Sequence, residues 1–292
     1  MGHGPFTAGA PRRRKLSGMA APDTSGQLAR DWDSGVPENL RRTRTILAGG
    51  AATTVYVARY ESGRSTLRLA LLRRPAPLEA WCASSGVSEA VVGGFFTRPP
   101  PGSGERSTPL GELRTHGVRR RSVPFQAPWD GRRACVHIAR GEARIARRDE
   151  LADEPRGDLL QAGPLLVRDG ARVVEAGRDA EGFSAGASQF DSDITAGRYP
   201  RAALAFTDDE ILAVACDGRA GDDAGLTLVE LADLLVGLGA RAAINLDGGG
   251  STSLVCGGVL QNRPRADVGV DLRGGRAVAT ALVIEPRQAP LT

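Results

Sequence analysis

Lysine and aromatic residues are scarce in this sequence. Lys15 is the only lysine, so arginine supplies nearly all of the positive charge, and the formal net charge is +4. Aromatic residues make up 4% of the chain, too few for the stacking platforms with which proteins bind single-stranded nucleic acid. The basic residues also match no nucleic-acid-binding motif. We therefore expect no nucleic-acid partner.

Long hydrophobic runs are also absent. No stretch is long and apolar enough to span a bilayer, and the basic cluster 12–15 is not followed by the hydrophobic segment of a secretory signal. We therefore expect no membrane partner and a cytoplasmic location. The heavy use of arginine, alanine and glycine is typical of high-GC coding, such as that of actinobacteria, and indicates a bacterial source.

Cysteine is rare and widely spaced. The four cysteines are Cys82, Cys135, Cys216 and Cys256, and they include no C-x-x-C pair. This spacing argues against a metal site built from them. Most lie in apolar surroundings, so buried free thiols are expected. A disulfide between Cys216 and Cys256 is left open, because both lie near the glycine-rich stretch discussed below.

The N-terminal residues differ in composition from the rest. Residues 1–38 are rich in glycine, proline, serine and arginine and lack apolar periodicity, which predicts a disordered basic arm. Residues 39–292 contain no internal repeat and no obvious linker, which predicts a single domain. A hydrophobic content of 41% is adequate for a globular core.

Short hydrophobic segments predict many strands. Segments 53–60 and 66–72 flank Glu61-Ser62-Gly63-Arg64 and predict a β-hairpin. Further strands are predicted at 134–139, 202–206, 252–256 and 277–284, and a short helix at 77–84. His137 alternates with apolar neighbours and is interpreted as a structural residue. Segment 263–275 is predicted to be a polar loop.

Residues 211–246 predict a strand, a loop, a helix and a second strand. Thr227 and Glu230 have the spacing of a capping box, leucines recur at helical spacing after them, and Gly239 suits the helix C-terminus. If the two strands are parallel neighbours, they form a right-handed crossover, and Asp217 and Asp247 emerge at one edge of the sheet. We predict the α+β class (mixed α/β): a twisted mixed β-sheet packed on a few helices, with 211–246 carrying the site.

The most informative stretch is Ile244-Asn245-Leu246-Asp247-Gly248-Gly249-Gly250-Ser251-Thr252. An apolar strand ends on a carboxylate, and three glycines and two hydroxyls follow. Glycines permit close approach of another molecule, and their N–H groups can face an anion. A tight turn needs only one or two glycines, so a ligand-binding loop is favoured. Strand alternation also places Asn245 and Asp247 on one face.

A second glycine pair lies at Gly93-Gly94-Phe95-Phe96, directly after a predicted strand. The glycines permit close approach, and the phenylalanines suit a pocket wall. A β-bulge with two core aromatic residues explains the segment equally well.

Four segments, taken together, resemble the phosphodiester glycosidase family. They are Gly93-Gly94-Phe95-Phe96; Ala162-Gly163-Pro164-Leu165 with Asp169-Gly170; Asp217-Gly218-Arg219 with Gly225-Leu226-Thr227 and Glu230-Leu231-Ala232; and 245–252 with Asn262 and Arg276 after it. The last two are the specific ones. Val92 stands where the family usually has asparagine.

The resemblance implies hydrolysis of the glycosidic bond of a sugar-1-phosphodiester, a sugar-phosphate or nucleotide-linked metabolite, to free sugar and a phosphomonoester. Asp247 and Asp217 are then the candidate catalytic carboxylates, and Arg219 is the catalytic arginine that holds the leaving phosphate. The residues expected to bind substrate are Asn245, Gly248, Gly249, Gly250, Ser251, Thr252, Gly94, Phe95, Arg201 and Arg276.

Simpler interpretations remain open at this point. The two aspartates also suit capping of loop N–H groups, and each arginine also suits a structural ion pair. No cofactor is predicted, although a divalent metal between Asp217 and Asp247 is left open. The alternative function is a non-catalytic glycan or sugar-phosphate binding protein, which Val92 supports. The expected partner is a small sugar-phosphate substrate, and the oligomeric state is open.

Overall fold

The computed structural model describes residues 1–2, 37–97, 107–184 and 194–288. The chain divides into two units, and the description below concerns the second unit, Trp32–Thr292. The basic arm predicted for residues 1–38 lies almost entirely outside the described residues. Among those residues, no helix has both the length and the apolar character needed to cross a membrane.

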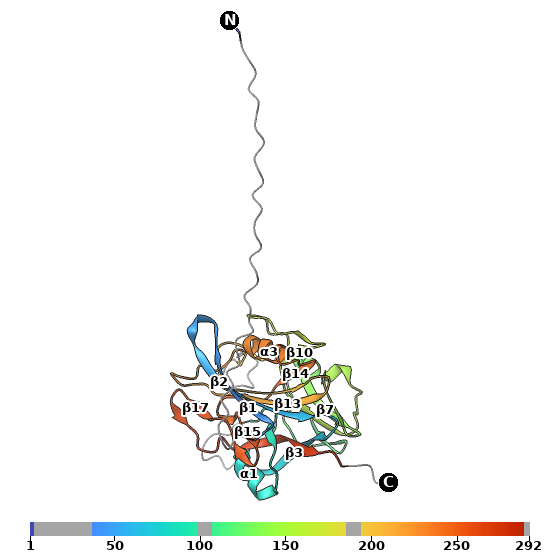
Figure 1. The fold of residues 1–292 in the computed structure, drawn as a ribbon. Helices are drawn as coiled ribbons and strands as arrows, with labels where there is room; N and C mark the ends of the chain where they lie inside the picture. Colours follow the sequence, from blue (N-terminus) through green and yellow to red (C-terminus); the bar gives the residue numbers. More distant parts are fainter. Residues whose placement is uncertain (3–36, 98–106, 185–193, 289–292) are drawn as a thin grey trace. The chain divides into compact units, whose positions relative to one another are not determined.

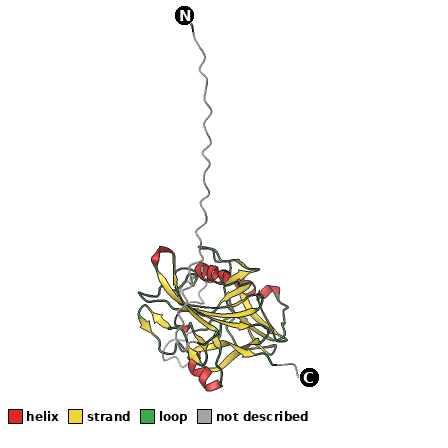
Figure 2. Ribbon diagram, viewed as in Figure 1, coloured by secondary structure: helices red, strands yellow, loops and turns green. Residues whose placement is uncertain are grey.

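Three β-sheets make up most of the second unit (Figures 1 and 2). The largest has the spatial order β1 (Leu40–Ile46), β2 (Ala52–Glu61), β13 (Glu210–Cys216), β12 (Arg201–Phe206), β14 (Ala242–Asn245), β10 (Leu165–Arg168), β11 (Ala171–Arg172). We call it the seven-stranded sheet.

Two five-stranded sheets accompany it. The C-terminal sheet has the order β16 (Val259–Leu260), β15 (Leu254–Cys256), β4 (Ala90–Val92), β19 (Val278–Pro286), β3 (Ser65–Ala76). The middle sheet has the order β6 (Val118–Arg119), β5 (Leu113–Thr115), β9 (Asp158–Gln161), β7 (Ala134–Ala139), β8 (Glu142–Arg147).

The remaining elements are short. A two-stranded ribbon consists of β17 (Arg265–Asp267) and β18 (Val270–Asp271). The α-helices are α1 (Leu78–Ser85), α2 (Trp129–Arg132) and α3 (Leu228–Gly237), and single 3-10 turns occur at η1 (Ala48–Gly50), η2 (Arg148–Glu150) and η4 (Gly249–Ser251). The ribbon β17–β18 occupies the segment predicted to be a polar loop.

The α+β class is confirmed, but the prediction of a sheet with both parallel and antiparallel strands is wrong for the described residues. In the described part of the chain, every ladder between named strands is antiparallel. Strands β13 and β14 run in the same direction without being neighbours, because β12 lies between them and pairs antiparallel with both. Their C-terminal ends therefore do reach one edge of the sheet, as the sequence predicted.

The predicted hairpin of segments 53–60 and 66–72 is wrong. The turn exists, since the Arg64 N–H donates to the Glu61 carbonyl at 3.0 Å, but β2 pairs with β1 and β13 while β3 pairs with β19. The two strands thus enter different sheets. These pairings let both strands bury side chains between sheets, which an isolated two-stranded hairpin cannot do.

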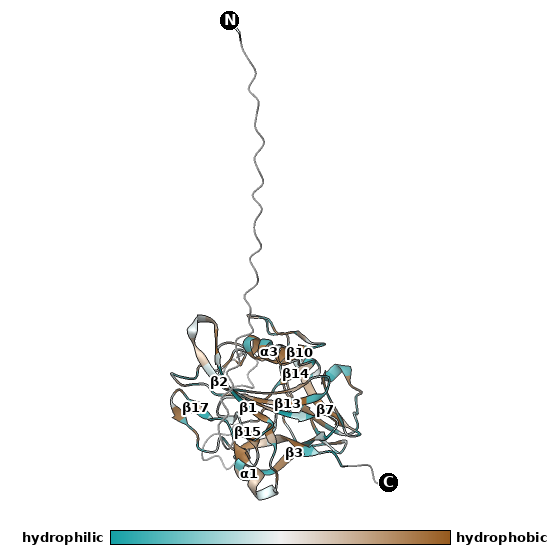
Figure 3. Ribbon diagram, in the orientation of Figure 1, coloured by the Kyte–Doolittle hydropathy of each residue, from teal (hydrophilic) through white to brown (hydrophobic). Residues whose placement is uncertain are grey.

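The core lies between the three sheets, and a second cluster lies between the seven-stranded sheet and α3 (Figure 3). The side chains of strand β2 alternate between these two clusters. Tyr56 and Ala58 face the core between the sheets, whereas Val55 and Val57 face the cluster beneath α3. Helix α3 covers this face with residues at helical spacing: Leu228, Leu231, Ala232 and Leu235.

The predicted capping box of α3 is confirmed. The Thr227 hydroxyl accepts from the Glu230 N–H at 3.1 Å, and the Glu230 carboxylate accepts from the Thr227 N–H at 2.9 Å. Gly239 follows the C-cap with φ of +88°, a conformation that favours glycine.

The four cysteines are buried and free, as expected. Cys216 and Cys256 therefore form no disulfide. Burial raises the pKa of each thiol to about 12, so the thiols stay protonated at neutral pH.

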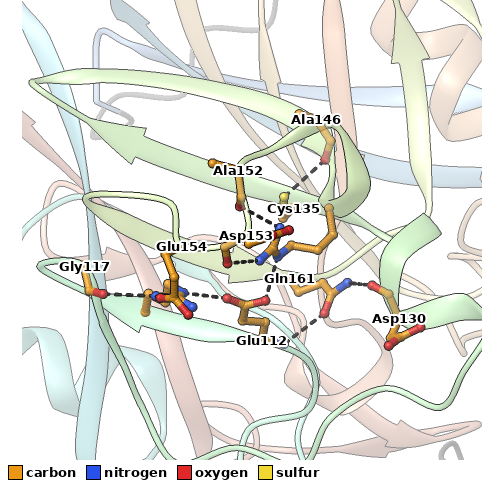
Figure 4. Close-up of polar contacts among 11 residues, drawn as sticks. Glu112, Gly117, Asp130, Cys135, Ala146, Ala152, Asp153, Glu154 and Gln161 are labelled. Carbon is orange, nitrogen blue, oxygen red and sulfur yellow. Dashed lines mark hydrogen bonds and ion pairs between the residues drawn. The ribbon is translucent and has the colours of Figure 1, made fainter.

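A partly buried ion cluster around Glu112 ties the middle sheet to the turn after β8 (Figure 4). Arg114 and Arg148 each donate from Nε to one oxygen of Glu112, both at 2.6 Å. Burial alone would raise the pKa of Glu112, but the hydrogen bonds from Arg148 and Arg114 outweigh it and hold the pKa below its usual value. Arg148 also donates to the Ala152 and Asp153 carbonyls.

A buried carboxylate, that of Glu181, joins two sheets. Glu181 Oε1 accepts from the Leu165 N–H at 2.7 Å and Oε2 accepts from the Ala134 N–H at 2.9 Å, which links β10 to β7. Burial raises the pKa of Glu181 to about 7, although both N–H groups act in the opposite direction.

We expect Glu112→Gln to lower the free energy of unfolding by about 3 kcal/mol, because it leaves two largely buried guanidinium groups without their shared charge. Glu154→Gln is the control: it removes the second carboxylate that pairs with Arg114, and the Glu154 side chain is 82% exposed. That substitution should cost much less, because exposed ion pairs are screened by water and salt. Urea denaturation of both variants measures the difference, and equal losses would contradict the assigned role of Glu112.

Glu181 should make stability fall as pH rises from about 4.5 to about 7. In that window the folded protein keeps a proton that the unfolded chain releases, since the pKa of Glu181 rises from 4.5 to about 7 on folding. The contribution is about 3 kcal/mol, fully present below the window and lost above it. In Glu181→Gln, the free energy of unfolding should no longer fall with pH over this window. Unfolding free energies at pH 5 and pH 7.5 test this, and parallel curves for the two proteins would refute it.

Candidate active site

A cavity of about 320 Å³ lies at the shared edge where β13 and β14 end. Nine of the predicted site residues line it: Asp247, Arg219, Asn245, Gly248, Gly249, Ser251, Phe95, Arg201 and Arg276. The lining also contains Phe96, which the sequence indicated together with Phe95 as a pocket wall. The residues that sequence reasoning missed are Ile194, Tyr199, Pro200, Leu246, Ala266 and Asp267. The two glycine-rich motifs and the Asp217-Gly218-Arg219 segment therefore do converge.

Asp247 is placed by the contact between the two glycine motifs. Its backbone N–H donates to the Gly93 carbonyl at 3.0 Å, and its Oδ1 accepts from the Gly248 N–H at 2.9 Å. Position 93 has no room for a side chain, because a Cβ there would lie 2.4 Å from Thr280 Oγ1 on β19. The half-buried carboxylate is thus held at the end of β14, facing the cavity.

Arg219 reaches the cavity from the loop after β13. Its backbone has φ of +58°, and its Nη1 donates to the Arg265 and Ala266 carbonyls of β17. Burial lowers the pKa of Arg219, and Asp267 acts in the opposite direction. A guanidinium keeps its charge in proteins, so Arg219 presents a fixed cation to the cavity.

Tyr199 connects two of the arginines. The centroid of its ring lies 5.5 Å from Cζ of Arg201 and 5.7 Å from Cζ of Arg219, within the range of cation–π attraction. Arg201 is itself buried and donates from Nε to the Leu226 carbonyl at 3.0 Å. The sequence offered one signal for Tyr199, an aromatic residue flanked by Arg198 and by Pro200-Arg201 just before a strand.

Arg276 differs from the other arginines of the cavity. Its backbone N–H donates to the Gly250 carbonyl at 2.9 Å, but its guanidinium has no hydrogen-bond or ion-pair partner among the described residues. The half-buried guanidinium is therefore available to an anionic ligand.

The three glycines make room for their neighbours. A Cβ on Gly248 would lie 2.9 Å from the Pro200 carbonyl oxygen; one on Gly249, at φ +60°, would lie 3.2 Å from Arg219 Nη1; and one on Gly250 would lie 3.0 Å from Arg276 Nη2. The expected anion-binding role of their N–H groups is not supported at two positions. The Gly248 N–H donates to Asp247, and the Gly249 N–H donates to the Pro200 carbonyl.

Asp217 lies outside the cavity lining and is 2% exposed. Its Oδ2 accepts from the Tyr56 hydroxyl at 3.0 Å and its Oδ1 accepts from the Arg263 N–H at 2.6 Å. Burial raises the pKa of Asp217, and these two hydrogen bonds act in the opposite direction. The structure therefore gives Asp217 the capping role: it anchors the segment leading into β17, whose carbonyls hold Arg219.

Other predicted site residues also lie outside the lining, namely Gly94, Gly250 and Thr252. Val92 is fully buried in the inter-sheet core, so valine at this position removes no group from the described lining. Phe95 is both a wall of the cavity and a core aromatic residue. It lines the cavity, and the centroid of its ring lies 5.6 Å from that of Phe183.

Two residues of the cavity lining, Asn245 and Ser251, each carry a buried polar atom without a partner among the described residues. Asn245 Nδ2 donates to the Gly163 and Leu246 carbonyls, at 3.0 and 2.9 Å, while Asn245 Oδ1 and Ser251 Oγ receive no hydrogen bond from the described residues. Such atoms cost about 1–3 kcal/mol each when they stay unsatisfied, so functional sites are where they are expected.

No group of three or more His, Cys, Asp or Glu side chains suited to a metal ion occurs in the described part of the chain. The Asp217 carboxylate is engaged by Tyr56 and Arg263, and only Asp247 of the predicted pair lines the cavity. The geometry therefore gives no support to the metal site left open between the two aspartates.

A larger cavity of about 520 Å³ lies between residues 173–181 and the start of α3. None of the predicted site residues lines it. Its charged residues have both signs, with Glu181 and Glu230 beside Arg147 and Arg178, and it lacks the cationic character of the first cavity.

A sequence model of the phosphodiester glycosidase family matches residues 85–285. The chain therefore belongs to the phosphodiester glycosidase family, as the motif resemblance implied. No curated protein sequence matches the chain.

Solved structures share the fold. The catalytic domain of zebrafish N-acetylglucosamine-1-phosphodiester alpha-N-acetylglucosaminidase, auto-inhibited by its pro-peptide, is 19% identical with a TM-score of 0.62, over 87% of this chain and 86% of that one. A hypothetical protein from Synechocystis is 19% identical with a TM-score of 0.55, over 86% and 62%. A protein of Burkholderia pseudomallei K96243, provisionally designated as exported, is 19% identical with a TM-score of 0.59, over 82% and 76%. At this identity the likeness establishes the fold alone.

Proposed function

We propose that the protein hydrolyses the glycosidic bond of a sugar-1-phosphodiester, releasing free sugar and a phosphomonoester. The substrate class includes nucleotide-linked sugars. The observation that carries the proposal is the placement of Asp247 in one cavity with Arg219 and Arg276. Membership of the phosphodiester glycosidase family supports it.

The reaction needs a carboxylate at the sugar and cations at the phosphate. The bond between the anomeric carbon and the bridging oxygen breaks, this oxygen leaves with its electron pair on the phosphate, and water supplies the hydroxyl of the sugar and a proton to the surroundings. A phosphate is a weakly basic leaving group, so general-acid help is less important than holding its charge. Asp247 then acts on the oxocarbenium-like transition state, as nucleophile or as base for water.

The arginines suit the phosphate because they are already oriented. Arg219 Nη1 is fixed by two carbonyl groups, which leaves its Nη2 for a phosphate oxygen. The Arg276 guanidinium, which also lines the cavity, has no partner among the described residues. A guanidinium binds phosphate through paired N–H groups. Arg201, whose Nε is engaged by Leu226, contributes charge and supports Tyr199.

Asp217 is a positioning residue in this proposal. It acts through the segment that holds Arg219 and does not contact substrate. Burial lowers the pKa of Arg219, and Asp267, which also lines the cavity, acts against that shift. Asp267 is therefore the second carboxylate near the substrate in this proposal. The alternative, a non-catalytic binding protein, loses its main support because Val92 lies in the core.

Hydrolysis of a small substrate panel tests the proposal. The panel contains glucose 1-(methyl phosphate), N-acetylglucosamine 1-(methyl phosphate) and two UDP-sugars, each with and without EDTA. We expect free reducing sugar together with a phosphomonoester or nucleotide, at a rate that EDTA does not change. Release of a sugar 1-phosphate would mean cleavage at phosphorus and would contradict the proposal. Binding of the panel without any product would favour the binding protein.

Exchange of each aspartate for asparagine separates the two roles. We expect Asp247→Asn to lower kcat about 10³-fold while substrate binding is kept, because the substitution removes the negative carboxylate that acts on the anomeric carbon. Asp217→Asn keeps the shape and an acceptor, so it should lower the melting temperature and reduce kcat less than about 10-fold. Steady-state kinetics and thermal melts of both variants measure this. A loss of kcat in Asp217→Asn equal to that in Asp247→Asn would return Asp217 to the catalytic set.

A further inference from the structure

The ribbon β17–β18 holds Arg219 without belonging to a larger sheet. Among the described residues its two strands pair only with each other, and such a ribbon has little stability of its own. The carbonyls of Arg265 and Ala266 on β17 nevertheless accept from Arg219 Nη1. The Gly269 N–H, between the two strands, donates to the Arg219 carbonyl at 2.8 Å. The position of Arg219 therefore depends on what fixes the ribbon.

Arg219 needs this support because its own surroundings do not favour its place. Its backbone has φ of +58°, a conformation that residues other than glycine rarely adopt. Burial lowers the pKa of its guanidinium, Asp267 acts against that shift, and the charge of Arg276 adds to it. The two cations therefore repel each other, and contacts with the ribbon have to offset this repulsion.

The Arg265 side chain fixes the ribbon to the loop after β13. Arg265 is 6% exposed and does not line the cavity. Its Nε donates to Asp271 Oδ1 on β18 at 2.8 Å, and its Nη1 donates to the Gly218 carbonyl at 3.1 Å. One guanidinium thus joins both strands of the ribbon to the residue that directly precedes Arg219.

The contacts between the loop and the ribbon are reciprocal. Arg219 donates to the carbonyl of Arg265, and Arg265 donates to the carbonyl of Gly218. The Arg263 N–H adds a further link, because it donates to the Asp217 carboxylate at 2.6 Å. Three consecutive residues of the loop are thereby bound to the ribbon and to the segment that leads into it.

We propose that Arg265 is a positioning residue, whose guanidinium holds the ribbon against Gly218 and so keeps Arg219 oriented toward the phosphate of the substrate. This inference rests on the part of the proposed function in which Arg219 binds that phosphate. Arg265 itself does not contact substrate. Its removal should therefore weaken phosphate binding only while Arg219 is present.

The chain supplies a matched control in Arg114. Arg114 is 2% exposed and does not line the cavity. Like Arg265, it donates from Nε to a carboxylate, that of Glu112, at 2.6 Å, and from Nη1 to a glycine carbonyl, that of Gly117, at 3.2 Å. Arg265→Met and Arg114→Met therefore remove the same kind of buried guanidinium. Both should lower the melting temperature, but only the first removes a contact with the loop that carries Arg219.

Binding of methyl phosphate measures the effect on Arg219. This phosphomonoester is the expected product from glucose 1-(methyl phosphate), and phosphorus NMR titration below the melting temperature of each variant gives its Kd. We expect Arg265→Met to raise the Kd by about 10-fold to 30-fold, because a guanidinium that is no longer held in place binds phosphate less well. Arg114→Met should stay within about twofold of the parent. An unchanged Kd in folded Arg265→Met would overturn the inference.

A double substitution separates positioning from a general loosening of the structure. In the Arg219→Gln protein the side chain that Arg265 positions is absent, so the further change Arg265→Met should raise the Kd by less than about threefold. An increase as large as in the parent would overturn the inference, because Arg265 would then affect the phosphate by another route. A Kd that Arg219→Gln alone leaves unchanged would overturn it as well.

Arg265→Lys decides the question if Arg265→Met does not fold. Lysine keeps the positive charge beside Asp271, but its single nitrogen cannot replace donors at both Nε and Nη1. The Kd of methyl phosphate should rise at least about threefold, since the ribbon is then held less firmly. A Kd equal to that of the parent would overturn the inference.

Comparison of binding with turnover separates failure of this inference from failure of the proposed function. Weaker binding of methyl phosphate to Arg265→Met, without hydrolysis of any substrate by the parent, would support the positioning role and overturn the hydrolysis. Hydrolysis by the parent, with Kd and kcat/KM unchanged in Arg265→Met, would overturn the inference and leave the function standing. Absence of methyl phosphate binding to the parent would overturn the inference, because Arg219 would then hold no phosphate.

Discussion

The site depends on one hydrogen bond, from the Asp247 N–H to the Gly93 carbonyl. Strand β4 belongs to the C-terminal sheet and β14 to the seven-stranded sheet, so this bond joins two sheets at the point where both strands end. Position 93 also requires glycine, because a Cβ there would meet Thr280 of β19. Asp247, the glycine turn after it and Phe95 all take their places from this contact, and the arginines are arranged around them.

Local features of the sequence predicted much of the architecture. The capping box of α3 and the strand before Asp247 depend on residues close together in the chain, and the structure contains both. The convergence of the two glycine motifs, which lie far apart in the chain, was expected from the family resemblance and not from local features. Long-range pairing was less predictable. The two strands of the expected hairpin, β2 and β3, enter different sheets. Their partners, β13 for β2 and β19 for β3, come from distant parts of the chain.

The candidate site shows the same division. The aspartate at the end of each strand could be found from the sequence, but their different roles could not. Asp217 is covered by Tyr56 and the Arg263 N–H, and both partners are remote in sequence. Tyr199 and the ribbon β17–β18 were missed because a single aromatic residue and a short polar hairpin have no periodicity to reveal them. The polar atoms without partners become evident only when burial is known.

The way Arg219 is held affects how freely this part of the chain can vary during evolution. Its guanidinium is fixed by main-chain carbonyls of Arg265 and Ala266, and a carbonyl persists whatever side chain its residue carries. Substitutions at 266 and 267 can therefore change the surface presented to a ligand while the orientation of the cation is inherited unchanged. Such an arrangement lets descendants of one ancestral enzyme diversify the groups they recognise without first having to rebuild the charge that all of them use.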